Sequence, residues 1–105
     1  MGRVVIAAYR PKAGKQAELE ALTLEHHGIL MNEGLVTSRK PIVMRSQDGT
    51  IVEVFEWVSD TAIDSAHENP AVLKLWGRYE ACSEYVALPQ LAESKELFAT
   101  FDAVE

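Results

Sequence analysis

A hairpin in the middle of the chain is the sequence feature that most restricts the fold. Residues 39–58, "RKPIVMRSQDGTIVEVFEWV", hold two runs rich in β-branched and aromatic residues, and Asp48-Gly49 lies between them. An Asp-Gly pair in that position is the strongest short-range indication of a tight antiparallel turn. Pro41 lacks the N–H that a strand ladder needs, so we expect the first strand of the hairpin at an edge of the sheet.

The segment before the hairpin predicts a strand and then a helix. Residues 3–10 form a short apolar run typical of a strand. Residues 15–33 repeat apolar side chains at helical spacing, and Gly34 follows as a C-terminal cap. The stripe on one face of this helix consists of Leu19, Leu22, His26, Ile29 and Leu30.

The segment after the hairpin predicts two helices and a last strand. A short helix begins at residue 59 or 60, and Asn69 and Pro70 suit the N-cap and first position of the next helix, which runs to about Ser83. Residues 84–93 are expected to be an irregular connection, and residues 95–104 a final strand.

The resulting order, βαββαβ, predicts an α+β fold of the ferredoxin-like type. Right-handed crossovers place both helices on one face of a four-stranded antiparallel sheet. The 105 residues are enough for one compact core, so we expect residues 1–105 to form a single domain.

The second face of the predicted sheet is also apolar. In the strand of residues 51–58, Val52 and Val54 alternate with Phe55 and Trp57, so apolar side chains point both ways. A face left uncovered by the helices would expose a larger apolar patch than soluble monomers usually carry. We therefore expect a homodimer in which two copies pack through their sheet faces.

Composition argues against several classes of partner. Ten basic and sixteen acidic residues give a net charge of −6, which disfavours nucleic acid as a partner. No apolar run approaches the roughly 20 residues of a membrane helix, so no membrane partner is expected. Cys82 is the single cysteine, and a reduced, cytoplasmic location is the expectation. The sequence has no phosphate-loop or metal-ligand motif, so we expect the protein to bind neither a cofactor nor a metal.

Two stretches carry a family resemblance. Ala66–Trp76, "AHENPAVLKLW", and the closing "FATFDAV" are similar to the antibiotic biosynthesis monooxygenase (ABM) domain family of the dimeric α+β barrel superfamily. The order of elements extends the resemblance over nearly the whole chain. Families of this kind include cofactor-independent oxygenases of quinols and anthrones, haem-degrading enzymes, lactone isomerases and members without an assigned reaction.

The chain also departs from patterns of that family. The haem-degrading branch carries an Asn on its first strand, and none lies between Arg3 and Arg10. Family members often have a second His after the Pro, where this chain has Ala71. A reaction that needs a pair of histidines at that place is therefore not supported.

Two histidines are candidates for a catalytic base. His67 follows Ile63 by four residues on one helix face, and it is either a pocket residue or a joint residue whose ring binds a backbone carbonyl near Asn69. His26 interrupts an apolar stripe, so its ring must find a partner or line a cavity.

Aromatic side chains could form the walls of a ligand cleft. Trp76 and Tyr79 share a helix face that is either plain core or, if a cleft exists, a source of indole N–H and phenol O–H donors. Tyr9 and Trp57, on the two central strands, could close the same space, and Asn69 is a further candidate donor.

The family resemblance implies a cofactor-independent monooxygenase that acts on a small aromatic or quinol-like substrate between helices and sheet, and these residues suit that reaction. Such a reaction needs a dry pocket, a base and an oxyanion donor. The base is His67 or His26, and we favour His67 because the resemblance is sharpest there. The alternatives are a non-catalytic dimeric module that binds a small apolar ligand, and a lactone isomerase-like enzyme.

Overall fold

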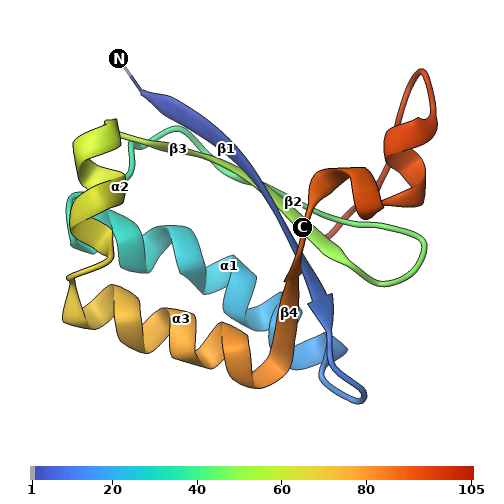
Figure 1. Cartoon of the computed structure of the whole chain (residues 1–105), viewed down its shortest axis with the longest axis horizontal. Helices are drawn as coiled ribbons and strands as arrows, with labels where there is room; N and C mark the ends of the chain where they lie inside the picture. The colour runs from blue at the N-terminus through green and yellow to red at the C-terminus, as the bar shows by residue number, and fades with distance from the viewer. Residues whose placement is uncertain (1) are drawn as a thin grey trace.

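The computed structural model describes residues 2–105 as one antiparallel sheet with three α-helices (Figure 1). The sheet has five strands in the order β4-β1-β3-β2-β5. Their bounds are β1 Arg3–Pro11, β2 Ile42–Arg45, β3 Ile51–Trp57, β4 Ser83–Val86 and β5 Asp102–Ala103. The α+β class is confirmed, whereas the predicted number of four strands is wrong.

The hairpin of β2 and β3 forms as predicted. Gly49 has a φ of 91°, a conformation that glycine adopts without steric cost. The Asp48 carboxylate accepts a hydrogen bond from the Thr50 N–H at 3.0 Å, which closes the turn. Pro41 precedes β2, and β2 is not an edge strand because β5 pairs with its outer side. The prediction that β2 forms an edge of the sheet was wrong. The short β5 pairs with it from a distant part of the chain, which the local pattern around Pro41 does not indicate.

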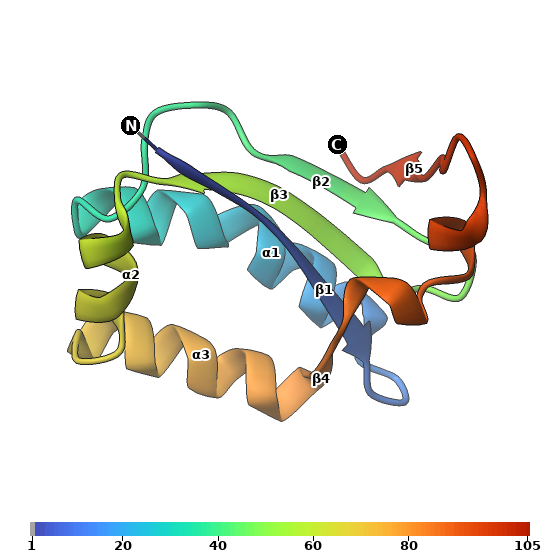
Figure 2. The same cartoon turned by 45° about the horizontal axis from the view of Figure 1, so that its top comes forward.

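The helices α1 (Gln16–Asn32) and α3 (Pro70–Cys82) lie side by side on one face of the sheet, and α2 (Asp60–Ala66) links β3 to α3 at one end (Figure 2). The Asn69 side chain accepts from the N–H groups of Ala71 and Val72, at 2.9 and 3.2 Å, which confirms the predicted N-cap. None of the helices in residues 2–105 is long and apolar enough to cross a membrane.

The C-terminal part of the chain differs most from the prediction. Residues 84–86, expected to be irregular, form β4 together with Ser83, and β4 pairs with β1 in the register Tyr9↔Tyr85. Only β5 remains of the final strand expected over residues 95–104. The reason is tertiary: the chain leaves α3 beside the free edge of β1, where the Lys12 N–H donates to the Cys82 carbonyl at 2.9 Å.

The second face of the sheet is partly covered by the same chain. Two 3₁₀ turns, Leu88–Gln90 and Ala92–Lys95, cross it between β4 and β5. They bury Leu91 against Ala8 and Val52. A strip beyond this cover stays open to solvent, including Val4, Ile6 and Ile42, which are 62%, 50% and 59% exposed.

Candidate functional site

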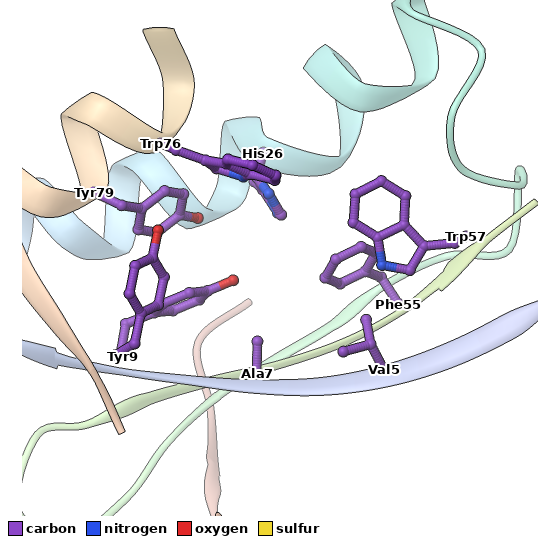
Figure 3. A pocket seen from close by; sticks show the side chains of 9 residues that line it. Val5, Ala7, Tyr9, His26, Phe55, Trp57, Trp76 and Tyr79 are labelled. Carbon is purple, nitrogen blue, oxygen red and sulfur yellow. The ribbon is translucent and has the colours of Figure 1, made fainter. Parts of the chain in front are cut away.

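An apolar pocket of about 380 Å³ lies between the sheet and the two long helices (Figure 3). Alternate side chains of β1 and β3 form its floor, and α1, α3 and β4 supply the rest of its wall. Its lining consists of Val5, Ala7, Tyr9, His26, Phe55, Trp57, Trp76, Tyr79 and Tyr85. No Lys or Arg belongs to this lining.

Strand alternation explains why the floor has this composition. Odd-numbered residues of β1 face the helices, and Val5 and Ala7 are too small to fill the space below α3. The same alternation in β3 brings Phe55 and Trp57 into the wall, with ring centroids 5.5 Å apart. Space therefore remains where small strand residues face large aromatic side chains.

A buried polar trio lies at the inner wall of the pocket. Glu53 is fully buried and its carboxylate accepts a hydrogen bond from the Tyr9 hydroxyl at 2.9 Å. His26, only 3% exposed, places its ring Nδ1 2.9 Å from a carboxylate oxygen of the same Glu53. Three elements, α1, β1 and β3, thus meet at one carboxylate.

The contact with Glu53 determines which ring nitrogen of His26 is available to a ligand. A carboxylate oxygen accepts hydrogen bonds, so Nδ1–H donates to Glu53, and in the neutral ring Nε2 then carries the lone pair. No partner within residues 2–105 bonds to Nε2. The ring lies edge-on to Phe55 and Tyr79, at centroid distances of 5.2 and 5.4 Å. These contacts present a hydrogen-bond acceptor in a largely apolar pocket.

Two stacked phenols flank this histidine. The rings of Tyr9 and Tyr79 stack with centroids 4.5 Å apart, and the Tyr79 hydroxyl donates to the Thr23 hydroxyl at 3.2 Å. Burial raises the pKa of both hydroxyl groups above the ordinary value, and the charge of Glu53 raises each further. Both side chains are therefore neutral donors at physiological pH.

The two indoles lie on different walls. Figure 3 shows Trp57 rising from β3 and Trp76 descending from α3, with the indole nitrogen of Trp57 turned towards the pocket. The ring of His67 contacts Trp76 edge-on at a centroid distance of 5.1 Å. His67 thus supports the orientation of a pocket residue from outside the lining.

The structure brings together most, but not all, of the residues singled out in the sequence. Its pocket lining includes His26, Tyr9, Trp57, Trp76 and Tyr79.

His67 and Asn69 lie elsewhere. His67 is exposed at the end of α2, and its Nδ1 is 2.9 Å from the Ile63 carbonyl oxygen. That geometry matches the joint-residue alternative, although the acceptor is one turn back rather than near Asn69. Asn69 caps α3 and donates its amide to Glu33 at 3.0 Å.

Sequence reasoning missed Glu53, Tyr85 and Thr23. Glu53 did carry a signal, because it shares the strand face of Ile51, Phe55 and Trp57 and is the polar member of an apolar row. Tyr85 and Thr23 carried none, since β4 was not expected and Thr23 fits an ordinary helix.

Within residues 2–105 no three His, Cys, Asp or Glu side chains converge in a way that could hold a metal ion. What the arrangement offers is proton chemistry: a base, two neutral phenols and an apolar surface.

No protein-family model and no curated protein matches the chain. Among solved structures, that of Rv0793 from Mycobacterium tuberculosis is similar, with a TM-score of 0.61 and 20% sequence identity. The match covers 88% of this chain and 99% of that chain. At this identity the likeness shows a shared α+β fold and carries nothing about activity.

Proposed function

We propose that the protein is a cofactor-independent monooxygenase of the ABM type that acts on an electron-rich hydroxyarene such as a hydroquinone or an anthrone. The observation that carries the proposal is the buried His26, whose Nδ1 is engaged by Glu53 and whose Nε2 is without a partner in an aromatic pocket. A flat ligand can lie between the sheet floor and Trp76.

The reaction follows from proton removal. His26 Nε2 takes the proton of the substrate O–H, and the electron-rich anion then passes an electron to O₂. For an anthrone the methylene carbon becomes a carbonyl: one atom of O₂ enters the product, and the other leaves as water with the two methylene hydrogens. The pocket surface is largely apolar, and the Trp57 indole N–H is the group that we propose as donor to the substrate oxyanion.

We further propose that the fold is ferredoxin-like and that two copies form a dimeric α+β barrel. The strand order β4-β1-β3-β2, with both long helices on one face, supports the first statement. Ile6, Val54 and Ile42 support the second, because they are neighbours across three strands on the face away from the pocket. Two of these three side chains are at least half exposed, and sheet-to-sheet packing would bury them.

A non-catalytic module that binds a small apolar molecule is the second candidate. The low polarity of the pocket favours it, because His26 is the lining residue with an accessible acceptor nitrogen. Oxygen uptake separates the two functions. Purified protein is mixed with a panel of hydroquinones and anthrones, without added metal or flavin. The oxygenase consumes O₂ in proportion to product, whereas the binding module binds panel members with no uptake above the spontaneous rate.

A further inference from the structure

We propose that Glu53 is a positioning residue that makes His26 an acceptor of protons from neutral hydroxyarenes. The inference rests on the proposed role of His26 as base, but not on any reaction with O₂. Its starting point is that Glu53 is a fully buried carboxylate in an otherwise apolar row of β3. A buried charge is costly unless it is paired, and the partners of this one are the pocket residues His26 and Tyr9.

The first effect of Glu53 is on the tautomer. Its carboxylate oxygen accepts a hydrogen bond from the Nδ1–H of His26. In the neutral ring, Nε2 therefore presents a lone pair to the ligand and not an N–H. A ligand hydroxyl that reaches Nε2 therefore donates, and a ligand carbonyl finds no donor at this position. The ring is preset for ligands with an acidic O–H.

The second effect is on charge. When the ligand O–H bond breaks and the proton forms a new bond to Nε2, the ring becomes an imidazolium between two negative groups, the ligand oxyanion and Glu53. The other ionisable lining groups are Tyr9, Tyr79 and Tyr85, for which burial raises the pKa. With no Lys or Arg in the lining, Glu53 is the group that stabilises the protonated ring.

The same set of ionisable groups at the pocket defines the class of ligand. A neutral hydroxyarene and neutral His26 exchange one proton, so the total charge of the pocket does not change. A carboxylate or phosphate on the ligand would add a negative charge near Glu53 with no cation in the lining to pair with it. We therefore expect hydroxyarenes without anionic substituents to bind best.

The test uses 4-nitrophenol, which does not turn over and whose phenolate is visible by absorbance. The wild-type protein should raise the phenolate fraction of the bound probe above that in solution at the same pH. Glu53→Gln keeps the size of the side chain but removes the negative charge that stabilises the protonated ring. We expect this variant to lower the ratio of bound phenolate to phenol roughly 10- to 100-fold.

One variant acts as a control. Glu93→Gln changes another buried carboxylate, one that accepts the Gln47 N–H at 2.9 Å on the far side of the sheet, and should change nothing. Thermal unfolding followed by circular dichroism identifies any variant that does not fold.

A second measurement needs no ligand. The ¹⁵N chemical shifts of His26 report the tautomer, and we expect Nδ1–H in the wild type, because a carboxylate oxygen of Glu53 accepts that proton. An Nε2–H wild-type ring, or an unchanged phenolate fraction in Glu53→Gln, would overturn the proposal. If the phenolate forms as expected but no panel member consumes O₂, the oxygenase proposal fails and the role of Glu53 stands.

Discussion

The Nδ1 atom of His26, on α1, lies 2.9 Å from a carboxylate oxygen of Glu53, on β3, although the two residues are 27 positions apart in the chain. Each side chain would be costly to bury alone, and together they form one hydrogen-bonded unit. The packing of α1 against β3 therefore brings these two polar groups together at the inner wall of the pocket.

Replacing His26 should remove the activity proposed here. His26→Gln keeps a polar side chain that cannot act as the base, and we expect the rate of O₂ uptake with an active hydroquinone or anthrone to fall roughly 10²- to 10⁴-fold. His27→Gln is the matched control, since His27 lies on the same helix outside the pocket lining and its Nε2 is 3.0 Å from the Thr37 carbonyl oxygen. Its rate should stay within a few-fold of the wild type. Equal rates for His26→Gln and wild type would exclude the imidazole as base.

Tyr9→Phe should destabilise the fold. The change leaves the buried Glu53 carboxylate without one of its donors, so we expect a loss of about 1–3 kcal/mol in the free energy of unfolding, measured with urea. Tyr85→Phe removes a hydroxyl from a side chain that is 57% exposed, and its free energy should differ little from that of the wild type. Similar losses in both variants would contradict the assigned role of the buried hydrogen bond.

The buried tyrosines Tyr9 and Tyr79 should resist ionisation in the folded protein. Burial raises the pKa of both hydroxyl groups above 10.0. The unfolded chain loses these protons near pH 10 and the folded chain does not, so stability is present below pH 10 and falls as the pH rises further. In Tyr85→Phe, which lacks the exposed tyrosine, tyrosinate absorbance should therefore rise together with loss of the circular dichroism signal. A separate tyrosinate transition at pH 10 in this folded variant would rule this out.

The open strip on the second face should mediate dimer formation. Sedimentation at micromolar concentration should give about twice the chain mass of 11.6 kDa. Ile6→Asp places a charge in the centre of the strip and should dissociate the dimer or cause aggregation. Leu73→Asp changes an equally exposed apolar residue on α3 and should leave the mass unchanged, since both side chains are 50% exposed. A monomeric wild type would contradict the proposed assembly.

The hairpin turn should contribute stability that acid removes. Hydrogen bonds from Ser46 and Thr50 lower the pKa of Asp48 to about 2, from 3.8. This contribution is complete above pH 3.8 and is lost as the pH falls through about 2. Asp48→Asn should cost about 1 kcal/mol at neutral pH and make the unfolding free energy depend less on pH below 4. Parallel acid unfolding curves for the two proteins would contradict this assignment.

The sequence by itself determined the local elements of this protein. The helix of α1, the turn at Asp48-Gly49 and the cap at Asn69 depend on neighbours within a few residues, and all three lie where the pattern predicts them. Side-chain periodicity also indicated that His26, Trp76 and Tyr79 point inward, because each lies on an apolar helix face.

Only the tertiary structure decided which of these residues meet in the pocket. The sequence favoured His67 over His26 as the base, yet His26 contacts Glu53 at the pocket and His67 contacts the Ile63 carbonyl outside it. Likewise β4 forms because the chain leaves α3 beside the free edge of β1, not because its few residues favour a strand. Contacts between segments far apart in the sequence depend on how the helices pack on the sheet. Local sequence patterns do not indicate which of these segments come together.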